Sequence, residues 1–147
     1  FDIDNFNNDN DTNGHLAGDK LLQELAGLVN EAVRKDDILG RFGGEEFLLV
    51  MPHTNATQAL AAGEKIRSLL AHHPFPFAEK QPLGCISISG GVAEYPFHGL
   101  DAAGLLHASD EALYEAKRSG RNRVLLAKAV APAPIVAPGG AREPQRQ

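Results

Sequence analysis

The stretch Arg41-Phe42-Gly43-Gly44-Glu45-Glu46-Phe47 joins two apolar segments and predicts a β-hairpin. The second segment, 47–51, is a continuous apolar run that Pro52 stops, which is typical of a short strand buried on both faces. Residues 38–42 pair with it across the two glycines, which tolerate positive φ and let backbone approach a ligand closely. Adjacent glutamates on a strand point to opposite faces, so one of them faces a given site. A solvated turn with charged neighbours is the alternative interpretation.

Helical and extended patterns alternate along the rest of the chain. Apolar residues spaced at 3.6 predict one helix at about 17–35, a second from a Thr54 or Asn55 cap to about residue 72, and a third that Asp101 caps. Strand patterns occur at 85–93 and 124–126. The order β, α, hairpin, α, β, α, β predicts an α/β (α+β) sandwich, in which helices cover a largely antiparallel central sheet.

Composition restricts the class of protein. The chain has 147 residues, 43% of them hydrophobic, a net charge of −5 and one cysteine, so it is predicted to be one reduced, cytoplasmic domain. No segment has the pattern of a membrane span or a secretion signal. The acidic balance argues against a general nucleic-acid or membrane surface. We expect the domain to span 1–128 and an Ala/Pro/Gly-rich disordered tail to follow at 129–147.

Two groups of charged side chains are candidates for a nucleotide site. Asp2 and Asp4 stand at the end of a short apolar strand, and with Glu45 they offer the few oxygen ligands with which Mg²⁺ binds substrate phosphates. Capping of the following turn is the alternative for the Asp pair. Four cations at 117–123 lie at the end of the third helix. They either complement the helix dipole or hold a triphosphate, and their spacing alone does not distinguish these two roles.

Five motifs follow one another in order: Asp-Ile-Asp at 2–4, Asn-Asp and Gly-Asp within 10–19, Gly-Gly-Glu-Glu-Phe at 43–47, Ser-Gly-Gly-Val-Ala at 89–93, and Asp-Glu-Ala-Leu-Tyr with Gly-Arg-Asn within 110–122. In this order and spacing, the chain over about 1–128 resembles the GGDEF-domain diguanylate cyclases. The resemblance implies a palm-like nucleotidyl-cyclase fold and a bacterial enzyme that joins two GTP into cyclic di-GMP and releases two pyrophosphates. It also implies a homodimer, and a sensory domain ahead of an opening helix and strand that precede Phe1.

The site roles come from the resemblance, residue by residue. Asp2, the Ile3 carbonyl and Glu45 would hold Mg²⁺ or Mn²⁺, and Glu45 and Glu46 would form the catalytic pair. An Asp carboxylate that accepts from a pair of base N–H groups favours guanine over adenine. The implied substrate contacts are Asn10 and Asp19 for the guanine, His15 for the ribose, the backbone of Asn5 and Phe6 together with Lys117 and Arg121 for the phosphates, and Gly43 and Gly44 at the hairpin tip.

A regulatory site is also implied. Arg34 and Asp37 form an Arg-x-x-Asp motif ahead of the hairpin, in the family's register for an inhibitory site whose arginine stacks on a guanine of bound product. Lys65 would be a secondary contact there. A charged helix end is the alternative interpretation.

Three residues depart from the family's pattern. Asn7 stands in place of a lysine that ordinarily meets a phosphate, and losing one such contact costs about 1.5–3 kcal/mol of binding. Asp9 replaces an apolar residue and Asn13 an aromatic or aliphatic one. The alternative function is therefore a catalytically weak domain that acts as a cyclic di-GMP receptor through Arg34 and Asp37.

Overall fold

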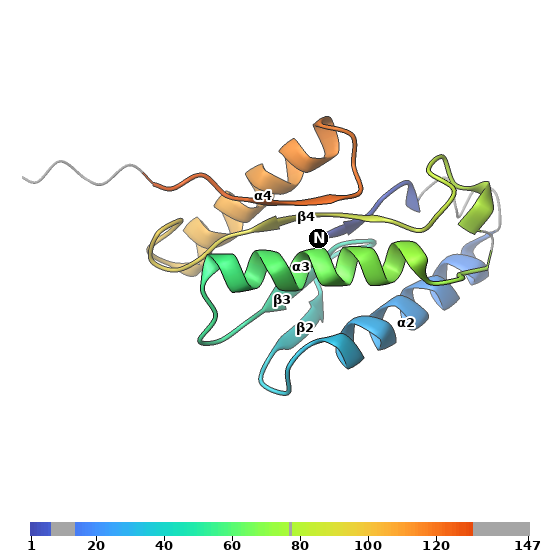
Figure 1. The fold of residues 1–147 in the computed structure, drawn as a ribbon, viewed down its shortest axis with the longest axis horizontal. Helices are drawn as coiled ribbons and strands as arrows, with labels where there is room; N and C mark the ends of the chain where they lie inside the picture. Colours follow the sequence, from blue (N-terminus) through green and yellow to red (C-terminus); the bar gives the residue numbers. More distant parts are fainter. Residues whose placement is uncertain (7–13, 77, 131–147) are drawn as a thin grey trace, which may run out of the picture.

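The computed structural model describes residues 1–6, 14–76 and 78–130, which form a sheet, a hairpin and the helices that pack on them (Figure 1). The elements are β1 (Asp2–Ile3), α2 (His15–Ala32), β2 (Ile38–Arg41), β3 (Phe47–Val50), α3 (Ala56–His72), the 3₁₀ turn η1 (Ala78–Lys80), β4 (Ile88–Val92), α4 (Ala102–Arg118) and β5 (Arg123–Leu126). This is the predicted order. The predicted tail at 129–147 lies outside the described residues from 131 onward, so its disorder stays a prediction.

The strands form a mixed sheet and a separate hairpin. In the sheet, β4 is central and pairs antiparallel with β1 and parallel with β5. The hairpin consists of β2 and β3, whose antiparallel register pairs Arg41 with Phe47 and Ile38 with Val50. The prediction of a mixed α and β fold with a largely antiparallel sheet is confirmed, and the parallel pair is the one that α4 connects.

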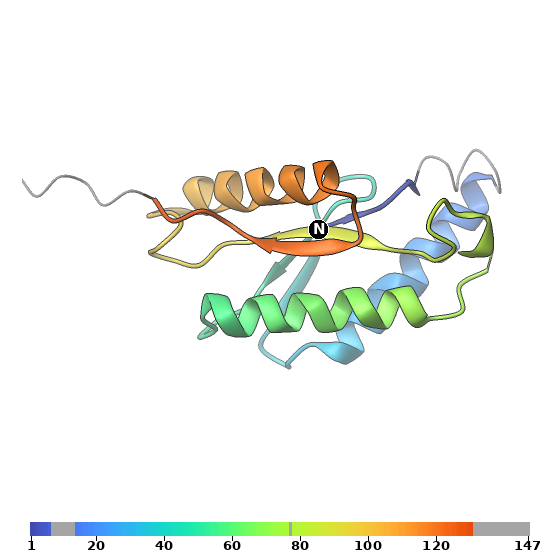
Figure 2. The same cartoon turned by 45° about the horizontal axis from the view of Figure 1, so that its top comes forward.

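Helices cover both faces of the sheet. Helix α4 lies on one face, and α3 with α2 beside it lies on the other (Figure 2). The contact of α4 with β4 is close at Gly91, where an added Cβ would lie 1.9 Å from the Ser109 carbonyl oxygen and 2.7 Å from the Leu113 nitrogen. Real Cβ atoms do not approach backbone so closely, so a residue without a side chain is required at this position.

We therefore expect Gly91→Ala to destabilise the fold by about 1–3 kcal/mol or more, because α4 must move away from β4 to admit the methyl group. Gly27→Ala is the matched control. Gly27 is an exposed residue of α2 with nothing within 4 Å of an added Cβ, so its replacement should stabilise the helix by about 0.5–1 kcal/mol. Denaturant unfolding of the full chain measures both changes. Equal free energies of unfolding for the two variants would contradict the close-packing argument.

The starts of α3 and α4 follow their predicted caps. Of the two predicted caps for α3, Asn55 is the one used: its side chain accepts from the Gln58 N–H at 2.8 Å, and the Gln58 side chain accepts from the Asn55 N–H at 3.1 Å. At α4, the Asp101 carboxylate accepts from the Gly104 N–H at 2.7 Å. Both caps satisfy backbone donors that the first helical turn leaves unpaired.

Helix α2 ends at Ala32, three residues before its predicted end. Val33 is extended, and the Asp37 carboxylate accepts a hydrogen bond from the Arg34 N–H at 2.9 Å. The Arg34 carbonyl accepts from the Asp37 N–H at 3.1 Å. An Asp side chain that bonds nearby backbone competes with helix formation. Residues 34–37 therefore form a compact turn instead of a last helical turn.

The hairpin is less buried than its apolar sequence predicts. Phe47 is buried, but Val50 is 46% exposed and Ile38 is 63% exposed. The expectation that the run 47–51 is covered on both faces is wrong, because β2 and β3 form a two-stranded sheet of their own (Figure 1). Only the start of β3, at Phe47, bonds to the segment that carries β1. The core lies instead where the helices meet the three-stranded sheet, around Leu25, Val29, Leu70, Ile86 and Ile88. Among the helices described, none has the length and apolarity needed to span a membrane.

Candidate active site

The tip of the hairpin lies against β1. The Ile3 N–H donates to the Glu45 carbonyl at 3.2 Å, the Phe47 N–H donates to the Phe1 carbonyl at 2.8 Å, and Asp2 forms an isolated bridge with Glu46. These contacts join segments more than 40 residues apart in sequence. They bring the backbone of the two predicted catalytic glutamates beside the strand that carries Asp2. Glu45 is half-buried, whereas Glu46 is exposed.

The two glycines of the tip make a narrow turn without positive φ. The Phe42 N–H donates to the Glu46 carbonyl at 2.8 Å, and the Arg41 guanidinium donates to the Gly44 carbonyl at 2.8 and 3.0 Å. Neither Gly43 nor Gly44 uses the positive φ that glycine tolerates. An added Cβ at Gly44 would meet nothing within 4 Å, so the space above this residue is open. Open space is what close approach of a ligand to backbone requires.

Asp2 is the most enclosed carboxylate of the predicted site. It is 2% exposed, and its Oδ2 pairs with the Lys117 ammonium, which comes from the last turn of α4. Its Oδ1 is buried and has no hydrogen-bond partner among the described residues. Burying a carboxylate oxygen without a partner is costly. The structure therefore brings together the predicted metal ligand and one of the two predicted phosphate-binding cations.

The donors around Asp2 fit a Mg²⁺ ion that is shared with a substrate. Within residues 1–6, 14–76 and 78–130, no group of three or more His, Cys, Asp or Glu side chains is placed to hold a metal. Mg²⁺ is usually bound through one or two carboxylates plus substrate phosphates, so it does not need such a group. The buried, unpartnered Oδ1 of Asp2 is a suitable oxygen ligand. Glu45 and the Ile3 carbonyl are the further predicted ligands on the adjoining backbone.

Asp4 has a different role from Asp2. It is 5% exposed, and its carboxylate accepts from the Ser89 hydroxyl at 2.6 Å, the Ser87 hydroxyl at 2.7 Å and the Asn122 N–H at 3.0 Å. Both oxygens are thus occupied by protein donors. The turn directly after β1 continues into residues outside the described part of the chain, so the alternative that the Asp pair caps it stays a prediction. Through the Asn122 N–H, Asp4 binds the turn between α4 and β5, which is more than 100 residues away.

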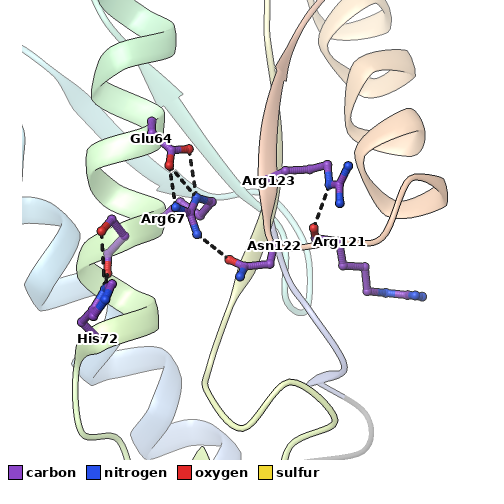
Figure 3. A network of polar contacts seen from close by, with 7 residues as sticks. Glu64, Arg67, His72, Arg121, Asn122 and Arg123 are labelled. Atoms are coloured by element: carbon purple, nitrogen blue, oxygen red, sulfur yellow. Dashed lines mark hydrogen bonds and ion pairs between the residues drawn. The ribbon is translucent and has the colours of Figure 1, made fainter.

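That turn carries Arg121, the second predicted phosphate-binding cation. Its N–H donates to the Ala116 carbonyl at 3.0 Å and its carbonyl accepts from the Arg123 Nε at 3.0 Å, so its backbone is fixed at both ends. The guanidinium of Arg121 is exposed and extends away from Asn122 (Figure 3). Among the described residues, the Arg121 guanidinium has no hydrogen-bond or ion-pair partner, and it stands on a well-held turn at the C-terminal end of the same helix that supplies Lys117.

The remaining predicted substrate contacts are only partly described. Asn5 has φ 56° in the turn after β1, and Phe6 is buried. Asp19 is exposed on the first turns of α2, and His15 begins that helix. Asn10, the other predicted guanine contact, lies outside the described residues, as do Asn7, Asp9 and Asn13. The guanine-binding role of this segment stays a prediction.

The three predicted regulatory residues line one cavity. Arg34 and Asp37 come from the turn after α2, and Lys65 comes from the middle of α3. The cavity has a volume of about 320 Å³, and part of its wall is apolar, formed by Val33 directly after α2 and by Ala62 and Ile66 of α3. A cavity with an apolar wall and a few charged groups is typical of a small-molecule site. None of the residues around Asp2 lines it, so the two sites are separate.

One side-chain contact next to Arg121 was not predicted from the sequence. Arg67, on α3, donates from Nη1 to the Asn122 side-chain oxygen at 2.9 Å (Figure 3). Its Nε donates to both carboxylate oxygens of Glu64 at 3.0 and 2.9 Å, and this bond raises the pKa of Arg67 and lowers the pKa of Glu64. The Glu64 and Arg67 pair has helical i, i+3 spacing that a sequence can reveal. Its contact with a residue 55 positions away has no signal in a single sequence.

The comparison with protein families identifies the family of this chain. The sequence profile described as "Diguanylate cyclase, GGDEF domain" matches residues 1–123. The chain belongs to the GGDEF diguanylate cyclase family. Diguanylate cyclase A of Treponema denticola is a curated relative of this GGDEF domain, with 41% identity over 128 residues. The match covers 87% of this chain and 34% of that relative, so the chain spans about a third of the relative's length.

Solved GGDEF domains have the same architecture. The active GGEEF domain of a diguanylate cyclase from Vibrio cholerae superposes with a TM-score of 0.74 at 38% identity, covering 88% of this chain and 80% of that one. The GGDEF domain of DgcB from Caulobacter crescentus, solved in complex with c-di-GMP, gives a TM-score of 0.73 at 32% identity, covering 85% and 73%. The predicted family and the predicted palm-like fold are both confirmed.

Proposed function

We propose that this GGDEF domain is a Mg²⁺-dependent diguanylate cyclase that condenses two GTP into cyclic di-GMP. The observation that carries the proposal is the buried Asp2 carboxylate. One of its oxygens has no partner within the described part of the chain, the other pairs with Lys117, and the Gly-Gly-Glu-Glu-Phe hairpin lies against its strand. A carboxylate for a metal and a cation for phosphates are thus adjacent. The sequence identity of 41% to a named diguanylate cyclase supports the same activity.

The reaction balances as two nucleotidyl transfers. In each, a ribose 3′-oxygen forms a bond to the α-phosphorus of the other GTP, and the bond between the α- and β-phosphates breaks. Two pyrophosphates leave, and two 3′-hydroxyl protons are released. One domain holds one GTP, so two domains must face each other as a homodimer. A bound Mg²⁺ supplies positive charge next to the phosphates and lowers the cost of the developing negative charge.

Different residues of this chain would bind the metal, accept the proton and bind the nucleotide. Asp2, Glu45 and the Ile3 carbonyl would hold the metal, with Mn²⁺ as a substitute. Glu45 would accept the 3′-hydroxyl proton, and Glu46 is the second member of the pair. Lys117 neutralises Asp2 in this structure and would move to the phosphates together with Arg121 when the nucleotide binds. Asn10, Asp19 and His15 would contact the base and ribose, and Gly43, Gly44 and the backbone of Asn5 and Phe6 would leave room for the phosphates.

Metal removal tests this function directly. We expect the full chain, artificially dimerised, to convert GTP into cyclic di-GMP and pyrophosphate with Mg²⁺, and to stop when EDTA is added. Readdition of Mg²⁺ or Mn²⁺ should restore turnover, because the described carboxylates are too few to hold a metal without the nucleotide. Chromatography of the nucleotides measures both products. Turnover that persists in EDTA, or a dimer that binds GTP and makes no product, would contradict the proposal.

We further propose that product inhibits the enzyme at Arg34, Asp37 and Lys65. Their common cavity supports a small-molecule site at these residues. The related GGDEF domain of DgcB, solved in complex with c-di-GMP, supports cyclic di-GMP as the ligand. The second candidate function, a receptor for cyclic di-GMP with weak turnover, uses the same cavity and is favoured by Asn7, which replaces the usual lysine.

The wider organisation is also a proposal. We place the domain at 1–128 with a disordered tail after it, in a cytoplasmic part of a bacterial sensor protein. The relative from Treponema denticola is about three times as long as the matched region, which leaves room for a signal-receiving domain in proteins of this kind. No contact with nucleic acid or membrane is proposed for this segment.

A further inference from the structure

The turn between α4 and β5 has a backbone that needs external support. Gly120, Arg121 and Asn122 have φ values of 123°, 62° and 46°, so three consecutive residues are in the left-handed region. Only glycine enters that region without strain, although asparagine tolerates it better than most residues. A turn of this kind keeps its shape when surrounding contacts determine it.

Asn122 receives that support from two sides. Its N–H donates to the buried Asp4 carboxylate at 3.0 Å, and its side-chain oxygen accepts from the Arg67 guanidinium at 2.9 Å. Asp4 belongs to the segment that follows β1, whereas Arg67 belongs to α3 on the other side of the molecule's central sheet from α4. Glu64 in turn holds the Arg67 guanidinium through its Nε (Figure 3). The turn is thus tied to both β1 and α3.

The two contacts of Asn122 also hold the backbone of the preceding residue, Arg121. Arg121 is adjacent to Asn122, and its guanidinium has no hydrogen bond or ion pair among the described residues. The guanidinium therefore projects from a turn whose backbone is held by the Ala116 carbonyl and by the two contacts of Asn122. Asp4, which holds the turn, is two residues from Asp2, which pairs with Lys117. One short segment of chain thus sets the position of both predicted phosphate-binding cations.

We propose that Arg67 is a positioning residue for phosphate binding, acting through Asn122 on the direction of Arg121. The inference rests on the proposed function, because it takes Arg121 as a contact for the phosphates of GTP. Arg67 itself points at Asn122 and Glu64, so it does not contact the nucleotide. Loss of Arg67 keeps the Arg121 side chain but removes one of the two contacts that hold Asn122, so the turn that carries Arg121 is held less firmly.

The test compares the binding of Mg²⁺·GTP and of GMP to the full chain by calorimetry. GMP lacks the terminal phosphates, so the ratio of the two affinities isolates the phosphate contact. We expect Arg67→Ala to weaken GTP binding about tenfold, as the loss of one charge-assisted contact would, and to leave GMP binding within about twofold. Lys35→Ala is the control, because Lys35 is an exposed cation in the turn after α2 and belongs to none of the predicted nucleotide contacts. It should change neither affinity.

A double-mutant cycle with Arg121→Ala identifies the route. If Arg67 acts through Arg121, the double variant should bind GTP about as weakly as Arg121→Ala alone. The inference would be overturned if the losses of GTP affinity in the two single variants multiplied in the double variant. It would also be overturned if Arg67→Ala lowered the affinities for GTP and GMP equally. If Arg67→Ala gives no cooperative unfolding transition, Arg67→Lys, which keeps the charge without the planar fork, takes its place in the same cycle. Turnover is assayed separately, so a chain that binds GTP without making product refutes the proposed function and leaves this test intact.

Discussion

Replacement of Glu45 by alanine should reduce the formation of cyclic di-GMP by about 10²–10⁴-fold, the usual contribution of a positioned proton acceptor. The side chain is half-buried, and its backbone is bonded to β1 next to the buried Asp2 carboxylate. Its removal takes away a predicted metal ligand and the predicted base at once. Initial rates of pyrophosphate release from the dimerised full chain measure the loss.

The control for this prediction is Glu111→Ala. Glu111 is exposed on α4, where it pairs with His107, so its replacement should leave the rate within about twofold. Binding of cyclic di-GMP provides the second readout. Because the cavity of Arg34 and Asp37 does not include Glu45, product binding should survive in Glu45→Ala. Loss of both turnover and product binding would indicate a folding defect, and full activity would show that Glu45 is not catalytic.

Local features of this fold were predictable from the sequence. The caps of α3 and α4 depend on residues three positions apart, and the structure confirms Asn55 and Asp101 in these roles. The hairpin around Gly43 and Gly44 also formed as predicted, because turn and strand signals are local. The adjacency of Glu45 and Asp2 followed from the resemblance to the family, since 43 residues separate them and no periodicity relates them.

Long-range contacts were not predictable. Ser87 and Ser89 alternate with apolar residues along the predicted strand, yet both serines are buried and donate to the Asp4 carboxylate. The Arg67 contact with Asn122 likewise depends on how α3 and the turn after α4 meet in three dimensions. The exposure of Val50 depends on which strands pair, and a continuous apolar run does not contain that information. The missed features are thus the ones that tertiary packing decides.

Replacement of Arg34 by alanine should weaken product inhibition by about 10- to 100-fold, which corresponds to one lost hydrogen-bonded charge. In the turn at 34–37, the Asp37 carboxylate accepts from the Arg34 N–H and holds the backbone from which the arginine side chain extends. Arg34 and Lys65 then line the same cavity from two different elements. Inhibition curves with added cyclic di-GMP measure the change in half-inhibitory concentration.

Lys35→Ala is the matched control, because Lys35 is an exposed neighbouring cation and does not line the cavity. It should leave inhibition within about twofold.

The initial rate of Arg34→Ala, taken before product accumulates, separates the two candidate functions. A normal rate without inhibition is expected of a regulated cyclase, since the cavity is separate from Asp2 and Lys117. If the wild-type chain binds cyclic di-GMP through Arg34 but turns over no GTP, the receptor function replaces the enzyme. Unchanged inhibition in Arg34→Ala would remove the regulatory proposal, because no other described element presents an arginine to this cavity.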